Sequence, residues 1–96
     1  MQIVAVNARP VHETAAIDTG NPSFLSYAPG SSLKAAKTFP FNVTFEGGGT
    51  VTFQSAPKIN GVASAVMEYS HNVLALGFLQ PFDVTFDDQQ KVAYFA

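Results

Sequence analysis

Ala15-Ala16-Ile17-Asp18-Thr19-Gly20 is the stretch around which we expect the chain to be organised. Its apolar residues, typical of a buried strand, run directly into an acid, a hydroxyl and a glycine. A carboxylate held against an apolar wall is costly to keep charged, and such carboxylates are where acid–base chemistry is usually found. The stretch therefore indicates a strand that delivers Asp18 to a functional loop, in which Gly20 allows backbone angles or close contacts that other residues do not.

The residues before this stretch predict a β-hairpin. Gln2 to Val6 is rich in branched residues and is expected to form a strand at the edge of a sheet. Asn7-Ala8-Arg9-Pro10 is typical of a turn, because asparagine tolerates unusual backbone angles and proline keeps the residue before it extended. Val11 to Ile17 is expected to return as the second strand.

The residues after the Asp18 loop predict two short elements. Phe24-Leu25-Ser26-Tyr27 is expected to form a short apolar strand, which Ala28-Pro29-Gly30 ends. Ser31-Ser32 is typical of a helix cap. Leu33 to Lys37 is then expected to form one or two helical turns, with lysines suitably near the end.

The middle of the chain predicts two hairpins. Phe41 to Phe45 and Thr50 to Phe53 both alternate apolar and polar residues, and the glycine-rich segment Glu46-Gly47-Gly48-Gly49 joins them. Asn60-Gly61 lies between branched residues, which is the strongest short signal for a hairpin turn. Ala63 to Tyr69 is expected to run back as a further strand.

The last third predicts strands with one helical turn between them. Val73 to Gly77 is an apolar strand that ends in glycine, and Phe78 to Gln80 is expected to form a single helical turn that Pro81 stops. Phe82 to Phe86 alternates, and Lys91 to Phe95 is the expected closing strand. The whole pattern predicts an all-β fold with one or two very short helices.

Composition limits the classes of protein to consider. The 96 residues are enough for one domain, spanning 1–96, with a single modest core. The charged fraction of 12% is low, which suggests a surface that meets a partner. The net charge of -2, with the basic residues scattered, argues against nucleic acid as a ligand. No apolar run approaches the roughly 18 residues of a membrane span, and no signal peptide is visible. We therefore expect a soluble protein that does not enter membranes, in a compartment that the sequence leaves open.

Metal and cofactor sites are not expected. Without cysteine the chain has no disulfide framework, thiolate site or thiol nucleophile. His12 and His71 lie far apart in sequence and are expected at the surface. Asp83, Asp87 and Asp88 could suggest a cation loop, but they are expected to be solvated polar residues on a strand face and in a turn.

Two segments together resemble a known family. "VNARPVHETAAIDTG" (Val6 to Gly20) looks like the hairpin that leads into the Asp-Thr-Gly of retropepsin-like aspartic proteases, which have a single lobe. "LALGFLQPFDVTFDDQQKVAYFA" (Leu74 to Ala96) is similar to the end of such a lobe in order, spacing and turn composition. The resemblance covers nearly the whole chain, and it implies a closed acid-protease-like barrel lobe with a glycine-rich flap hairpin.

The resemblance also implies an activity and its residues. It assigns Asp18 as the catalytic acid of an aspartic endopeptidase, within the active-site loop Thr19, Gly20 and Asn21. Since the chain offers a single suitable aspartate, a symmetric homodimer would pair the two Asp18 carboxylates. The resemblance further implies that Glu46 to Gly49 forms the flap over an extended peptide or protein substrate. The terminal strands, Gln2 to Val6 and Val92 to Ala96, are candidates to interleave between the copies.

Three points leave alternatives open. Serine, threonine or alanine usually follows Asp-Thr-Gly in this family, whereas this chain has Asn21. "FPFNVTFEGGGTVTF" (Phe39 to Phe53) also looks like the C-terminal lobe of two-lobed, pepsin-like enzymes. A catalytically inactive module of the same fold, used for dimerisation or peptide binding, is the alternative function, and the glycine-rich segment can be a plain hairpin tip.

Overall fold

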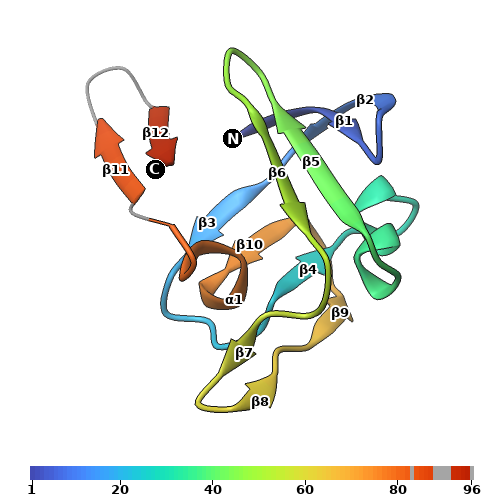
Figure 1. Ribbon diagram of the computed structural model, residues 1–96. Coiled ribbons are helices and arrows are strands. Elements are labelled where there is room, and N and C mark those ends of the chain that lie inside the picture. The colour runs from blue at the N-terminus through green and yellow to red at the C-terminus, as the bar shows by residue number, and fades with distance from the viewer. Residues whose placement is uncertain (83, 88–91, 96) are drawn as a thin grey trace.

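An antiparallel sheet with the strand order β2-β1-β5-β6 forms one half of the protein (Figure 1). Its strands are β1 (Gln2–Val6), β2 (Arg9–Thr14), β5 (Phe41–Phe45) and β6 (Thr50–Phe53). The computed structural model describes residues 1–82, 84–87 and 92–95. Strand β1 pairs with β2 on one side and with β5 on the other, so the expectation that it forms an edge is wrong. Ile3 and Val6 are buried, which places β1 over the core.

The first hairpin is tighter than the sequence predicted. Asn7 and Ala8 both have positive φ angles, 51° and 64°, and they form the turn between β1 and β2. Paired positive φ angles match the right-handed twist of the strands that such a turn joins. Pro10 therefore lies inside β2, which is an edge strand of its sheet and can accept a residue without a backbone N–H.

The second sheet mixes parallel and antiparallel pairs in the order β3-β10-β4-β9. Its strands are β3 (Ala16–Asp18), β10 (Val73–Ala75), β4 (Leu25–Tyr27) and β9 (Val66–Glu68). β10 runs parallel to β3 and antiparallel to β4, and β4 runs parallel to β9. The two inner strands, β10 and β4, are buried along their whole length, as expected for short apolar runs.

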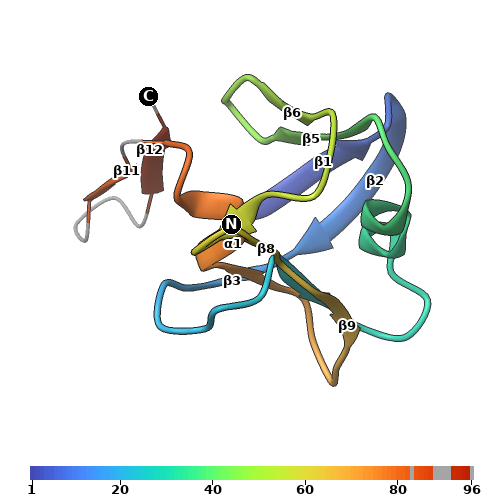
Figure 2. The same ribbon diagram turned by 60° about the horizontal axis from the view of Figure 1, so that its bottom comes forward.

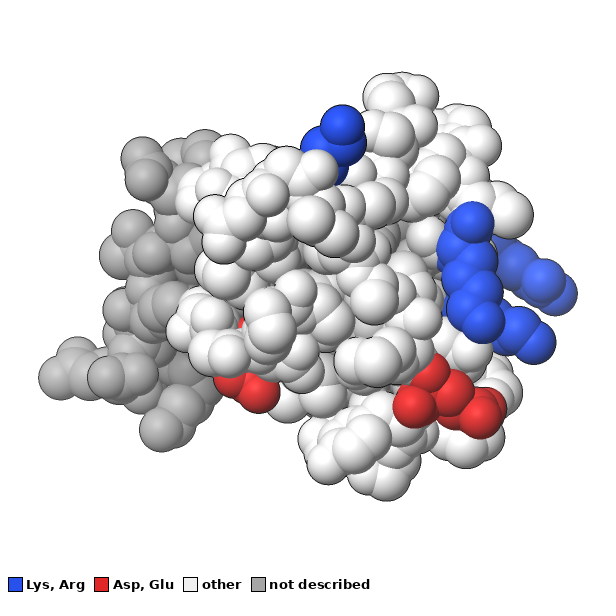
Figure 3. All heavy atoms as spheres, turned by 90° about the horizontal axis from the view of Figure 1, so that it is seen from below, with Lys and Arg blue, Asp and Glu red and all other residues white. Residues whose placement is uncertain are grey.

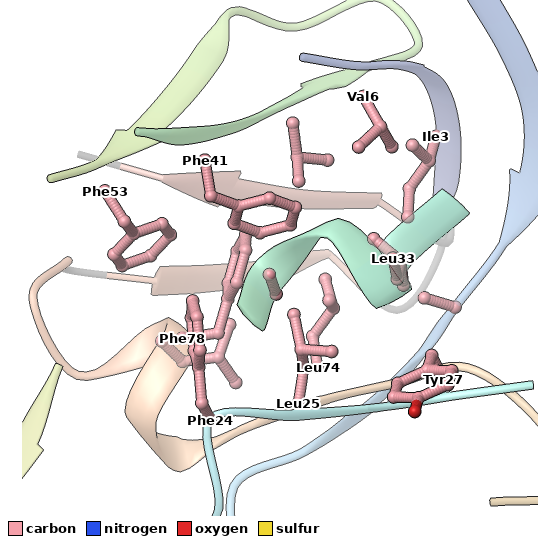
Figure 4. Close-up of a cluster of buried hydrophobic side chains, with 14 of the residues drawn as sticks. Ile3, Val6, Phe24, Leu25, Tyr27, Leu33, Phe41, Phe53, Leu74 and Phe78 are labelled. Atoms are coloured by element: carbon pink, nitrogen blue, oxygen red, sulfur yellow. The ribbon is translucent and has the colours of Figure 1, made fainter. Parts of the chain in front are cut away.

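The core lies between the two four-stranded sheets and is rich in phenylalanine (Figure 4). Phe24 is fully buried, and its ring centroid lies 4.9 Å from that of Phe53 and 6.0 Å from that of Phe41. Phe78 stacks on Phe24 at 6.0 Å between ring centroids. Aromatic pairs at such separations add to the free energy gained by burial. This cluster joins the first sheet to the segment that follows the Asp18 loop.

Two short helices and a small hairpin accompany the two sheets. The 3-10 helix η1 (Ser32–Lys37) is capped by Ser31, whose Oγ accepts a hydrogen bond from the Leu33 N–H at 3.1 Å. The helix α1 (Leu76–Leu79) directly follows β10. Strands β7 (Lys58–Ile59) and β8 (Val62–Ala63) form a two-stranded hairpin.

The turn of the small hairpin is the one the sequence predicted. Asn60 and Gly61 both have positive φ angles, 52° and 78°. The expected strand from Ala63 to Tyr69 is instead divided between β8 and β9. The Ser64 N–H and Oγ both donate to the Pro57 carbonyl, at 2.8 and 2.6 Å, and this bends the chain between the two strands.

Near the C-terminus, β11 (Val84–Asp87) and β12 (Val92–Phe95) pair with each other antiparallel. Figure 1 shows this hairpin to one side of the two larger sheets. Asp83 and Asp88 lie outside the described residues, as does the side chain of Asp87. The described part of the chain is therefore all-β with two short helices, and no closed barrel is seen among its strands.

Candidate active site

Asp18 is the last residue of the edge strand β3, where its register partner is Ala75 at the end of β10. The carboxyl ends of this parallel pair therefore meet at one point. The Asp18 side chain is exposed, and its Oδ1 accepts a hydrogen bond from the Gly20 N–H at 3.1 Å. Thr19 and Gly20 are also exposed in the single chain. The Asp-Thr-Gly segment is thus an ordered loop that presents its carboxylate outward.

The far end of this loop is held by the start of α1. The Leu76 N–H donates to the Asn21 carbonyl at 2.9 Å, and the Gly77 N–H donates to the Ser23 carbonyl at 2.9 Å. Backbone N–H groups in the first turn of a helix have no partner within that helix, so they are free to bind a neighbouring segment. Here they bind the loop and fix its distance from β10.

Asn21 has a structural role in the loop. Its Oδ1 accepts hydrogen bonds from the Ser23 N–H at 3.0 Å and the Ser23 Oγ at 2.8 Å. Asparagine commonly stabilises turns by such a contact with the backbone two residues later. The hydrogen bonds of the Asn21 amide are therefore made to Ser23, while the Asp18 carboxylate receives its bond from Gly20.

Gly77 lies where the loop, α1 and the β8–β9 connection meet. A Cβ atom added to Gly77 would lie 2.6 Å from the Ser64 Oγ, 2.9 Å from the Ser64 Cβ and 3.0 Å from the Phe24 Cα. Distances under 3.0 Å are closer than carbon atoms pack, so one of the neighbours would have to move. Glycine is required here for close packing.

The glycine-rich turn from Glu46 to Gly49 joins β5 to β6 and is exposed throughout. The Gly48 N–H donates to the Phe45 carbonyl at 3.1 Å, and the Glu46 N–H donates to the Gln2 carbonyl at 3.0 Å. Figures 1 and 2 both place this turn away from the loop between β3 and β4. In the single chain, the structure therefore does not bring the expected flap residues to Asp18.

A second polar cluster, which the sequence did not predict, surrounds the carboxylate of Glu13 in β2. The Glu13 carboxylate accepts hydrogen bonds from the Ser31 Oγ, from the Ser32 N–H at 3.0 Å and from the Asn72 Nδ2 at 3.2 Å. Burial opposes ionisation of Glu13, but these bonds outweigh it and lower the pKa of the carboxyl. No local pattern could have revealed the cluster, because Glu13 and Asn72 are far apart in sequence.

Charged side chains and possible metal ligands are sparse in the rest of the described chain. Figure 3 shows a face on which most side chains are uncharged, with the lysine, arginine and acidic groups toward its margins. His12 and His71 are exposed, as expected. Among the described residues, no group of three or more histidine and acidic side chains could hold a metal ion.

The described helices are short. No helix in the described part of the chain has the length and apolar character to cross a membrane. Comparison of the chain with protein-family models, with curated proteins and with solved structures finds no significant match.

Proposed function

We propose that the chain is one half of a homodimeric aspartic endopeptidase, in which two copies of Asp18 share the active site. The observation that carries the proposal is the setting of this carboxylate. It stands exposed at the end of an edge strand, in a loop held at both ends by backbone hydrogen bonds. The outer side of β3 has no strand partner among the described residues, so a second copy can approach Asp18 from that side.

The chemistry requires both copies. Hydrolysis of a peptide bond by water needs a base that takes a proton from the water and an acid that gives one to the amide. Two carboxylates a few ångströms apart hold one shared proton, because two like charges at that distance do not both ionise readily. A single Asp18 supplies only one of the two roles. A two-fold axis beside the loop would place the same residue of each copy opposite its twin.

The resemblance to retropepsin-like enzymes supplies the remaining roles in the proposal. Thr19 would bond across the two-fold axis, and Gly20 would keep a backbone N–H on the carboxylate. The acid-protease-like barrel lobe is part of the same proposal. Strand β1 is paired on both edges within its own chain, so the C-terminal strand β12 is the terminal strand left to contact the other copy.

The flap role of Glu46 to Gly49 is a separable proposal, because the turn lies away from Asp18 in the single chain. A flap would grip the backbone of an extended peptide by strand addition. Replacing Gly48 by valine should then raise KM for peptide substrates. An unchanged KM in that variant would leave the segment as a hairpin tip only.

One observation favours the alternative of a catalytically inactive module for dimerisation or peptide binding. In the single chain, the glycine-rich turn expected as a flap lies away from the loop that follows β3 (Figures 1 and 2). A cover that excludes bulk water strengthens the electrostatic interactions in a catalytic site. A module that only binds would not need such a cover.

Mixing two forms of the protein separates these functions. Asp18→Asn should abolish peptide hydrolysis while the fold and the dimer persist, and Glu68→Gln, a matched change of an exposed acid, should leave hydrolysis intact. If both carboxylates are needed, equal amounts of wild type and Asp18→Asn that exchange subunits should retain about a quarter of the activity, because random pairing leaves about a quarter of the dimers intact. Retention of about three-quarters would show that one carboxylate suffices, because random pairing leaves only about a quarter of the dimers without any. A wild-type chain without turnover, or one that sediments as a monomer at every concentration, would refute the peptidase.

A further inference from the structure

Strand β3 is too short to set its own register securely. It consists of Ala16, Ile17 and Asp18, and it pairs only with β10 among the described strands. In a β-strand, a shift of one residue turns every side chain to the opposite face. Such a shift would turn Asp18 away from the position where its loop presents it. Some other contact has to hold β3 in place against β10.

Asn72, the residue immediately before β10, makes one such contact. Its backbone carbonyl accepts a hydrogen bond from the Ala16 N–H at 3.0 Å, and its Nδ2 donates to the Thr14 carbonyl at 3.1 Å. The two bonds flank Ala15, which is buried. Asn72 thus bonds to the incoming chain on both sides of Ala15, about 10 Å along the strand from Asp18.

The rest of the cluster fixes the orientation of the Asn72 amide. The Oδ1 accepts from the Ala28 N–H at 2.8 Å, so the Nδ2 faces two acceptors, the Thr14 carbonyl and the Glu13 Oε1. Glu13 is in turn held by the Ser31 Oγ and by the Ser32 N–H at the start of η1. Asn72 is itself buried, so water has little access to replace a lost partner of the amide, and removing one partner is costly.

We propose that Asn72 is a positioning residue for Asp18, that it sets the register of β3 on β10, and that Glu13 holds its amide in the orientation this requires. The kinetic part of this inference rests on the proposed peptidase function. The structural part does not, because the register of β3 can be measured in a protein without turnover.

Asn72→Asp tests the structural part with little change in size. The aspartate side chain has no N–H to donate, so its carboxylate would face the Thr14 carbonyl and the Glu13 carboxylate, which can both only accept hydrogen bonds. Hydrogen exchange should show protection of the Ala16 amide falling at least about ten-fold, while the Glu46 amide, which binds the Gln2 carbonyl elsewhere, keeps its protection. Asn42→Asp, a matched change in β5, should leave the Ala16 amide protected.

Kinetics test the positioning itself. A displacement of about 1 Å in a reacting group can lower the rate about 100-fold. We expect Asn72→Asp to lower kcat about 10- to 100-fold while KM stays within about two-fold, because Asn72 is buried and does not itself face a substrate. A general loss of folding would instead lower the active fraction and the dimer together.

Glu13→Gln provides a second variant if Asn72→Asp does not fold. It keeps the size of the side chain but weakens the acceptor that orients the Asn72 amide, so it should lower kcat and the Ala16 protection by a smaller factor. Unchanged protection at Ala16 in the variant that folds, or kcat within two-fold of the wild type, would overturn the positioning role. A wild type without turnover would refute the peptidase function alone, and hydrogen exchange would still decide the register.

Discussion

Replacing Gly77 by alanine tests the packing that holds the Asp18 loop to the rest of the protein. The added methyl group would lie 2.6 Å from the Ser64 Oγ and 3.0 Å from the Phe24 Cα. Neither neighbour can move freely. The Ser64 Oγ donates to the Pro57 carbonyl at 2.6 Å, and the backbone of Phe24 is bonded to Ala65 at 2.8 Å and to Ala75 at 3.1 Å. The clash therefore has to be relieved by displacing α1 or the loop.

Two effects of opposite sign set the size of the change. Alanine is favoured over glycine inside a helix by about 1 kcal/mol. Overpacking a close contact costs about 1–3 kcal/mol, and the fixed neighbours place Gly77→Ala toward the upper end of that range. The net loss in the free energy of unfolding should be about 1–2 kcal/mol. For a domain of this size that corresponds to a fall in Tm of about 5–15 °C.

Urea and thermal unfolding of three variants would measure this loss. Gly49→Ala is the matched control, because a Cβ atom there meets open space, and its stability should stay within about 0.5 kcal/mol of the wild type. Adding Ser64→Gly to Gly77→Ala removes the two shortest contacts and should restore about half of the lost stability. A Gly77→Ala protein at least as stable as the wild type would refute the packing argument.

Three further predictions concern stability. The pKa of Glu13 is lowered from its ordinary value of 4.5, so the ionised carboxylate stabilises the fold above that pH, and this contribution disappears as pH falls through the lowered pKa. In Glu13→Gln, the urea midpoint should therefore fall less steeply below about pH 4.5 than in the wild type. An identical pH profile in the two proteins would contradict this role of Glu13. Phe24→Ala should lower the free energy of unfolding in urea by about 3–5 kcal/mol, since the side chain is fully buried. Val62→Ala is the control, because its side chain is 69% exposed, and it should stay within about 0.5 kcal/mol of the wild type. Similar losses in the two variants would be inconsistent with this core. Gly47→Ala should cost about 1 kcal/mol by thermal unfolding, because Gly47 has a φ of 70°; no loss would show that the turn relaxes to another conformation.

Much of the local structure was predictable because its cause is local. Alternation of apolar and polar residues correctly indicated β5 and β6, and Asn60-Gly61 correctly indicated the small hairpin turn. A strand leading to Asp18 was also predicted, but the expected strand from Val11 to Ile17 is divided into β2 and β3, which lie in different sheets. The serine before η1 does cap it, although the helix is of the 3-10 type. Where these predictions are correct, neighbouring residues alone determine the backbone.

Other features of the fold and of the candidate site depend on partners that are distant in sequence. Strand β1 looked like an edge because nothing in its residues reveals that β5 pairs with its second side. The hydrogen bond between Glu13 and Asn72 joins residues 59 positions apart. The glycine-rich turn was correctly predicted as a turn, but its distance from Asp18 depends on how the two sheets pack.

The amino-acid sequence by itself indicated the strand-rich class, several of the strands and turns, and that a strand leads into the Asp-Thr-Gly loop at Asp18. These properties follow from side-chain periodicity and from the backbone preferences of glycine, asparagine and proline, which act over a few residues. Only the tertiary structure decided that β3 lies parallel to β10, that Asn72 hydrogen-bonds to the chain before Asp18, and that α1 hydrogen-bonds to the loop after Asp18. Those contacts form only when packing of the core brings together strands that are far apart along the chain.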